Sequence, residues 1–251
     1  MPSHITSLRF SRTVVVLMAA GLLLLYGCSF EDAEQKTATA DATVGEAVTA
    51  VEVKDARRGS IEVTPGAGPG VTVHRTVHYR GDAVPKPGQR VAGGVLALTD
   101  GCSDPCFIDY RLEVPASATV TLAAGSGRIT VTGVAGADLS SSSGEVTADR
   151  ITGPLKVRTS SGSVTATALT APTADLRASS GDARLTFTTP PAAVTAETSS
   201  GDVTLRVPQA PYEITTTTTS GTRNTLPSTP TAPSHLSIQT SSGDIRIQPT
   251  P

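Results

Sequence analysis

Aromatic residues are scarce in this sequence: there are four Tyr, four Phe and no Trp, or 3% of 251 residues. A chain with so few rings lacks the stacking platforms on which proteins bind single-stranded nucleic acids. Its formal net charge is −2, and its basic residues form no continuous stripe. Both deficits argue against nucleic acid as a partner. The scarcity of aromatic residues also favours a thin interior, filled by small aliphatic side chains.

Helical periodicity is also absent beyond residue 28. Instead, a Ser-Gly pair followed by a polar residue occurs seven times. The glycines of these pairs are Gly127, Gly144, Gly162, Gly181, Gly201, Gly221 and Gly243. Successive glycines are 17, 18, 19, 20, 20 and 22 positions apart. A period of this length, marked by a turn residue, is typical of stacked β coils, each too short to hold a core alone.

Apolar residues recur in two columns after each glycine. The inner columns hold Ile129, Val146, Val164, Ala183, Val203 and Ile245, then Val131, Ala148, Ala166, Leu185, Leu205 and Ile247. The position between the two columns is Thr or Arg in each of these six copies. Such alternation predicts a strand with an apolar inner face and a polar outer face. Arg223 breaks the inner column after Gly221, so we expect that coil to be distorted or terminal.

A second turn divides each repeat, because Gly or Pro interrupts the sequence between successive Ser-Gly pairs, as at Gly153-Pro154 and Thr189-Pro190-Pro191. Proline cannot donate to a sheet ladder, so it belongs at strand ends. Each unit therefore reads as two short strands and two turns. Residues 46–125 continue this texture, and we predict one all-β solenoid domain over residues 46–251.

The beginning of the chain reads as a targeting segment. Arg9 and Arg12 precede an apolar run from Thr13 to Leu25, which is short for a membrane span and typical of a secretory signal. We therefore interpret residues 1–27 as a signal peptide. An ordinary signal peptide and an uncleaved anchor remain alternatives to the lipoprotein signal described next.

The segment Leu25-Tyr26-Gly27-Cys28 resembles a bacterial lipobox, although Tyr26 is larger than the residue usual at its place. This resemblance predicts cleavage before Cys28 and its modification by lipid, including palmitate, which would attach an extracytoplasmic protein to the cell membrane. Residues 28–45 are small and polar, and we expect them to form a flexible tether.

Cys102 and Cys106 are the two remaining cysteines, and turn-forming residues separate them. In an oxidising compartment this pair predicts a disulfide that closes a small loop. A structural metal site would need further soft ligands, and a redox pair would have a different spacing. Both remain weaker alternatives.

No catalytic, cofactor-binding or metal-binding residue is predicted. His74 and His78 have the spacing of a zinc pair only on a helix, whereas here they lie on an alternating strand and are expected to be solvated. His235 stands alone, and no Gly-x-Ser-x-Gly motif occurs. The acidic residues after the turn glycines, among them Asp182 and Asp202, could bind calcium or form a carboxylate pair. We interpret them as solvated turn residues.

The repeated Ser-Ser-Gly-Asp/Glu phrases, the Gly153-Pro154-Leu155 turn and the phrase Tyr110-Arg111-Leu112-Glu113-Val114-Pro115 resemble the bacterial putative adhesin family, also described as toastrack-like β-solenoids. The lipoprotein leader fits this resemblance. It implies a surface-exposed solenoid with a loosely inferred role in adhesion, and it supplies no catalytic residues.

From these features we predict a non-catalytic cell-surface lipoprotein whose rigid polar face binds a protein or a glycan of the envelope. The first alternative is a polysaccharide-acting enzyme on a β-helix, which would need at least two buried acids that face a cleft. The second is a sensory or structural envelope component that associates with a membrane protein. Fold analogy alone cannot choose among these functions.

Overall fold

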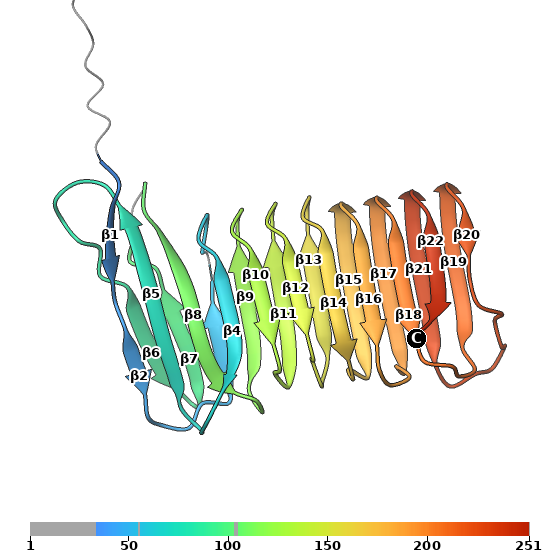
Figure 1. Ribbon diagram of the computed structural model, residues 1–251, viewed down its shortest axis with the longest axis horizontal. Helices are drawn as coiled ribbons and strands as arrows, with labels where there is room; N and C mark the ends of the chain where they lie inside the picture. The colour runs from blue at the N-terminus through green and yellow to red at the C-terminus, as the bar shows by residue number, and fades with distance from the viewer. Residues whose placement is uncertain (1–33, 55, 103–104, 251) are drawn as a thin grey trace, which may run out of the picture. The chain divides into compact units, whose positions relative to one another are not determined.

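The computed structural model describes residues 34–54, 56–102 and 105–250, which lie within one compact unit, Ala33–Pro251. The predicted signal peptide and Cys28 lie outside the described residues. Within those residues the chain has strands and no α-helix, which confirms the predicted all-β class (Figure 1).

Two sheets face each other across the core. Sheet A has twelve strands: β1 (Lys36–Thr39), β2 (Ala42–Val44), β4 (Ile61–Gly66), β5 (Val71–Tyr79), β8 (Phe107–Pro115), β10 (Ile129–Thr132), β12 (Val146–Asp149), β14 (Val164–Leu169), β16 (Ala183–Phe187), β18 (Val203–Val207), β20 (Arg223–Asn224) and β22 (Ile245–Pro249). Sheet B has ten strands: β3 (Ala50–Val53), β6 (Gly88–Ala92), β7 (Val95–Thr99), β9 (Thr119–Ala124), β11 (Gly136–Ser141), β13 (Leu155–Thr159), β15 (Thr173–Ser180), β17 (Ala193–Ser200), β19 (Glu213–Ser220) and β21 (His235–Ser242).

Each Ser-Gly pair connects a strand of sheet B to the next strand of sheet A, as the sequence predicted. Successive coils then pair in parallel with their columns in register: Val146 lies beside Val164, and Val164 beside Ala183. The apolar columns point into the space between the sheets, where Val164 is 1% exposed and Leu205 is fully buried. The predicted β-solenoid with its aliphatic interior is therefore confirmed.

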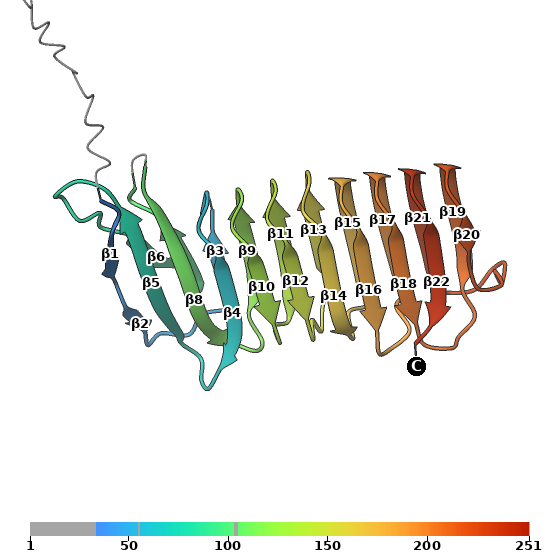
Figure 2. The same cartoon turned by 45° about the horizontal axis from the view of Figure 1, so that its top comes forward.

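The coils do not follow one another in chain order at either end of the solenoid. Near the C-terminus, the last coil, β21–β22, lies between β17–β18 and β19–β20, and Figures 1 and 2 both show this insertion. Near the N-terminus, β3–β4 lies between β7–β8 and β9–β10. The repeat predicted coils that pack on neighbours, but it carried no information on this exchange of order.

The exchange at the C-terminal end has a physical reason. Ile245 and Ile247 of the inserted coil are buried, whereas the outer coil offers only Arg223 at the matching position. Placing the apolar coil inside removes more apolar surface from water, which is the main favourable term in folding. The expectation that the coil with Arg223 is terminal is therefore confirmed.

The loop at 225–234 and the Arg223 side chain cover part of the outer edge of the coil β19–β20. The Ser228 hydroxyl accepts the backbone N–H of Ile214 at 2.9 Å, and Arg223 donates to the backbone carbonyl of Thr216 at 3.3 Å. An open strand edge can pair with other chains, so these contacts limit uncontrolled association.

The flexible tether predicted for residues 28–45 is wrong in its second half. Strands β1 and β2 pair antiparallel with β5, so Lys36 lies opposite Tyr79 and Val44 opposite Val71. The nine-residue β5 would otherwise present an unpaired edge, and covering that edge satisfies its backbone groups. The small side chains of this segment, read from sequence as a linker, suit an edge strand.

Candidate binding surfaces

The outer face of sheet B carries charged and hydroxyl side chains in registered rows. In one row, Ser140 of β11 lies beside Arg158 of β13, which lies beside Arg177 of β15. In the neighbouring row, Lys156 lies between Asp138 and Asp175. Parallel neighbouring strands lie about 4.8 Å apart, so these side chains form regular ladders across the coils.

The ion pairs along these ladders are long and exposed. Asp138 is 3.5 Å from both Lys156 and Arg158. Arg177 is 3.5 Å from Asp175 and 3.7 Å from Glu197, and both distances end on its Nε atom. Such exposed pairs stabilise a fold by less than about 1 kcal/mol each. Their main structural effect is to orient the guanidinium groups.

A depression of about 330 Å³ lies over β11, β13 and β15 at the end of these strands nearest the Ser-Gly turns. Its lining contains two arginines and no carboxylate: Ser140, Ser141, Ser142, Arg158, Thr159, Ser160, Arg177, Ala178 and Ser179. The short serine and alanine side chains between the longer arginines leave this space open. We call it the arginine depression.

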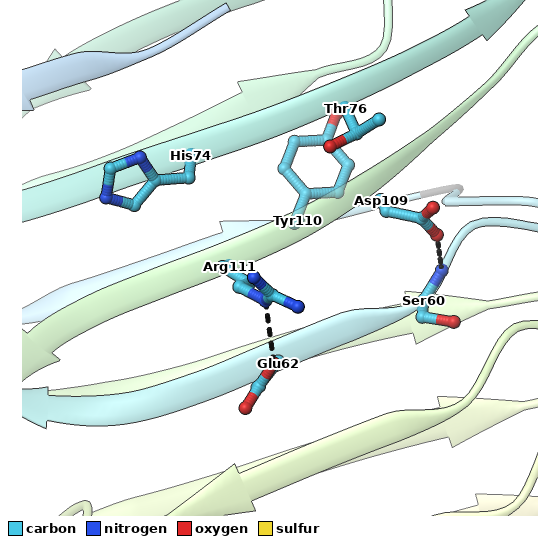
Figure 3. A pocket seen from close by; sticks show the side chains of 7 residues that line it. All are labelled: Ser60, Glu62, His74, Thr76, Asp109, Tyr110 and Arg111. Carbon is cyan, nitrogen blue, oxygen red and sulfur yellow. Dashed lines mark hydrogen bonds and ion pairs between the residues drawn. The ribbon is translucent and has the colours of Figure 1, made fainter. Parts of the chain in front are cut away.

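A second depression of about 330 Å³ lies on sheet A where β4, β5 and β8 meet (Figure 3). It is lined by Ser60, Glu62, His74, Thr76, Asp109, Tyr110 and Arg111. Its charged groups are already partnered: Arg111 lies 3.1 Å from Glu62, and Asp109 accepts the Ser60 backbone N–H at 2.7 Å (Figure 3). His74 lies 3.3 Å from Asp41. This depression also contains two carboxylates, Glu62 and Asp109, so it suits an anionic ligand less well than the arginine depression.

The predicted solvation of the two strand histidines is correct for only one of them. The His74 side chain is 51% exposed. The His78 side chain is only 20% exposed: its Nε2 lies 2.8 Å from Asp109 Oδ2, and its ring stacks on Phe107 with centroids 4.4 Å apart. The alternation placed His78 on the outer face correctly, but it could not show that β8 supplies an aromatic ring and a carboxylate beside it.

The other titratable groups that the sequence analysis raised, in this depression and elsewhere, form no catalytic or metal-binding group among the described residues. Burial raises the pKa of Tyr110 to about 12, so its hydroxyl holds its proton at physiological pH. His235 lies 3.3 Å from Glu213 at the other end of the solenoid, far along the chain from the other histidines. In the part of the chain that the structure describes, no group of three His, Cys, Asp or Glu residues is arranged to hold a metal ion.

The acidic turn column is a hydrogen-bonded stack. Asp182 accepts the backbone N–H of Asp202 at 3.0 Å, Asp202 accepts that of Asp244 at 2.8 Å, and Asp244 accepts that of Thr222 at 2.9 Å. Arg246 donates to both Asp202 and Asp244. These bonds hold the pKa of Asp202 and the pKa of Asp244 below their ordinary values, chiefly through the backbone N–H that each accepts. The column therefore ties coil to coil, which is more than the solvated turns that the sequence suggested.

The predicted disulfide between Cys102 and Cys106 is present, with the two Cα atoms 5.4 Å apart. The backbone N–H of Cys102 also donates to Asp100 at 3.3 Å. Cys28, the predicted site of lipid attachment, lies outside the described residues. Within those residues, no helix is both long and apolar enough to cross a membrane.

Two features were missed in the sequence, although a signal for each was present. Arg75 is 4% exposed because it lies between the inward-pointing Val73 and Val77, and the alternation predicts this orientation. Arg158 and Arg177 each stand four positions before a turn glycine, so reading the columns upstream of the glycines would have placed them side by side.

Several solved structures of low sequence identity are similar to this chain. A putative adhesin from Bacteroides fragilis is 17% identical, with a TM-score of 0.53 over 87% of this chain and 99% of that one. A putative adhesin from Parabacteroides merdae is 13% identical, with a TM-score of 0.48 over 86% and 97%. A putative cell adhesion protein from Clostridium sporogenes is 11% identical, with a TM-score of 0.42 over 86% and 100%. At these identities the first likeness supports the fold alone.

No curated protein matches the sequence significantly. A family match nevertheless covers residues 108–248, more than half of the 251-residue chain, and it spans all seven Ser-Gly turns. The chain therefore belongs to the Toastrack DUF4097 family.

Proposed function

We propose that this chain is a non-catalytic, lipid-anchored surface protein whose solenoid presents the outer face of sheet B to a protein or glycan of the envelope. The observation that carries this proposal is the pair of registered polar rows on that face, which cross four parallel strands from Asp138 to Thr195 and from Ser140 to Glu197. Parallel strands bonded in register fix the backbone beneath these rows, so binding requires no ordering of the backbone.

The structural likeness supports the proposal at the level of the fold. The Bacteroides fragilis protein is described as a putative adhesin, and adhesion needs an extended surface and no reaction centre. Fold likeness does not fix a ligand, so the proposal names a surface and leaves the partner to experiment.

The exposure of the acidic residues also supports a non-catalytic role. A polysaccharide-acting β-helix enzyme would need two carboxylates in a cleft, one of them with a raised pKa. The buried polar residues of the described chain are Arg75, Ser141, Thr159, Thr198 and Thr240, and they include no carboxylate. Asp202 and Asp244 have lowered pKa values, the opposite of what a general acid requires.

Anchoring through Cys28 is supported by the Leu25-Tyr26-Gly27-Cys28 segment and by the short distance along the chain to β1, which begins at Lys36. The test is expression of the full chain and of Cys28→Ser in a bacterium fed an alkyne-labelled palmitate. The anchor is supported if the full chain is labelled in the membrane fraction and is accessible to external protease, while Cys28→Ser is not labelled. Equal labelling of both chains contradicts it.

The binding role is tested by capture from native envelopes. The full chain, purified in a non-ionic detergent, is immobilised and exposed to solubilised envelope proteins and to an array of envelope glycans. Saturable binding that substitutions on the outer face of sheet B weaken supports the proposal. Binding that maps to the outer face of sheet A, or no binding in either arm, overturns it. A membrane protein recovered after mild cross-linking would identify the chain as an envelope component rather than a glycan adhesin.

A further inference from the structure

We propose that the arginine depression over β11, β13 and β15 binds an anionic group carried on a polysaccharide. This inference rests on the proposed binding role of sheet B and names the site and the ligand chemistry within it. The anionic group is the carboxylate of a uronic acid or a sulfate ester. The carboxylate is planar and the sulfate is tetrahedral, and both present anionic oxygens to a guanidinium.

The first observation is the direct juxtaposition of two like charges. Arg158 and Arg177 are registered neighbours on adjacent parallel strands and point to the same outer face. Like charges at such positions destabilise a sheet. Asp138, Asp175 and Glu197 offset this repulsion only through ion pairs of 3.5–3.7 Å, so a bound anion would add to the neutralisation of the two arginines.

The second observation is that the flanking acids leave donors free. The ion pair of Asp138 with Arg158 joins Nη1 at 3.5 Å, and the ion pairs of Asp175 and Glu197 with Arg177 join Nε at 3.5 and 3.7 Å. Among the described residues, no hydrogen bond engages the terminal amino groups of Arg177 or Nη2 of Arg158. Guanidinium groups bind the oxygens of carboxylates and other oxyanions through paired donors of this kind.

The third observation separates a sugar from a simple anion. The exposed serines Ser140, Ser142, Ser160 and Ser179 border the two arginines within the same depression, and no carboxylate lines it. A hydroxyl both donates and accepts, so these side chains match the hydroxyl groups around a sugar ring. An acidic peptide offers fewer groups of this kind, which makes the acidic glycan the better occupant.

The test measures binding of the full chain, in non-ionic detergent with EDTA, to four soluble polymers. Dextran sulfate is compared with dextran, which has the same sugar without the anion. Polygalacturonate is compared with polyglutamate, which carries carboxylates without sugar hydroxyls. We expect dextran sulfate or polygalacturonate, whichever anion the site prefers, to bind at least about tenfold more tightly than its own comparison polymer. That binding should weaken as salt is added.

The variants Arg158→Gln and Arg177→Gln should each weaken this binding by about tenfold or more, because each removes charge-assisted hydrogen bonds. Arg184→Gln is the matched control: it makes the same change on an exposed residue of β16, in sheet A. Equal binding by all three variants overturns the inference. So does binding of dextran as tight as that of dextran sulfate, or binding of polyglutamate as tight as that of polygalacturonate. If the chain binds an envelope protein or a neutral glycan but neither acidic polymer, the inference fails while the proposed function stands.

Discussion

The Asp202 carboxylate accepts the backbone N–H of Asp244 at 2.8 Å, although the two residues are 42 positions apart in the chain. The next coil in sequence after Asp202 begins its turn at Gly221, and Thr222 there donates to Asp244 instead. The hydrogen-bonded stack thus follows the order of coils in space. Its side-chain hydrogen bonds agree with the insertion of β21–β22 between β17–β18 and β19–β20.

This stack predicts a loss of stability in acid. The pKa of Asp202 and the pKa of Asp244 are lowered in the folded protein from their ordinary value of 3.8. The unfolded chain therefore takes up protons first as the pH falls, and acid favours unfolding. The contribution of the two groups should be complete above about pH 5 and should disappear as the pH falls through their folded pKa values, below 3.8. Denaturant titrations between pH 7 and pH 2.5 would measure it.

Asp202→Asn should remove part of this pH dependence. At pH 7 we expect a loss of about 1 kcal/mol or less, because the site is exposed and its pairing with Arg246 is screened. The difference in free energy of unfolding between Asp202→Asn and the natural chain should become smaller toward pH 3. Asp138→Asn is the control, since its carboxylate contacts only Lys156 and Arg158 at 3.5 Å. A difference that is the same at pH 7 and pH 3 for Asp202→Asn would contradict the assignment.

The exchanged coil order predicts which cysteine pairs can form a disulfide. Thr195 of β17 lies beside Ser237 of β21, and Ser237 lies beside Thr215 of β19. Neighbouring strands are about 4.8 Å apart, and strands two apart are about 10 Å apart, whereas a disulfide requires Cα atoms within about 7 Å. Thr195→Cys with Ser237→Cys should therefore oxidise readily, and Thr195→Cys with Thr215→Cys should not.

Peptide mapping under non-reducing conditions would distinguish the two pairs from the bond between Cys102 and Cys106. Efficient cross-linking of positions 195 and 215, with none between 195 and 237, would show that the coils stack in chain order.

The periodic part of the fold could be predicted from sequence because its signal is local. Each inner column reads directly as alternation around a turn glycine, and Val164 and Leu205 are buried as that alternation requires. Even the terminal place of one coil was readable, since Arg223 has no place in an apolar column. The position of Arg158 beside Arg177 follows from the same columns, so the candidate site was accessible to sequence reasoning as well.

The remaining features depend on contacts between distant segments, which periodicity does not encode. Nothing local in residues 36–44 distinguishes a linker from an edge strand, because their pairing is decided by the free edge of β5. The environment of His78 depends on Phe107 and Asp109, about 30 positions away. The coil order depends on a comparison of buried apolar surface between two whole coils.

Close stacking at the turns predicts a difference between two glycines with the same φ angle. Gly201 and Gly68 both have φ of 143°, a value that disfavours side chains. A Cβ at Gly201 would lie 2.3 Å from the backbone carbonyl oxygen of Gly181, whereas one at Gly68 meets nothing within 4 Å. Gly68→Ala should cost about 1 kcal/mol through the backbone alone. Gly201→Ala should cost at least about 2 kcal/mol more, since backbone must move.

Urea denaturation of both variants, with equal slopes, would measure these costs. Equal losses of stability for Gly68→Ala and Gly201→Ala would mean that the coils can separate at the turns without penalty, against the close approach described above.

The buried Arg75 predicts losses of stability of different size for two substitutions at one position. Its guanidinium donates to the Gln89 side chain at 2.8 Å and to the Ala40 carbonyl at 3.4 Å, while its Nε is buried without a partner. Burial lowers the pKa of Arg75, which reflects the cost of taking the charge out of water. Arg75→Met keeps the apolar stem and removes that cost, so stability should change by less than about 1 kcal/mol in either direction.

Arg75→Ala removes the stem as well and leaves a cavity between Val73 and Val77, so we expect a loss of about 2–4 kcal/mol. Thermal and urea denaturation of both variants would compare them, with Arg90→Met as an exposed control on β6. If Arg75→Met lost as much stability as Arg75→Ala, the hydrogen bonds to Gln89 and Ala40 would outweigh desolvation. The charge would then fasten β5 of sheet A to β6 of sheet B, and the stem would serve only to carry it.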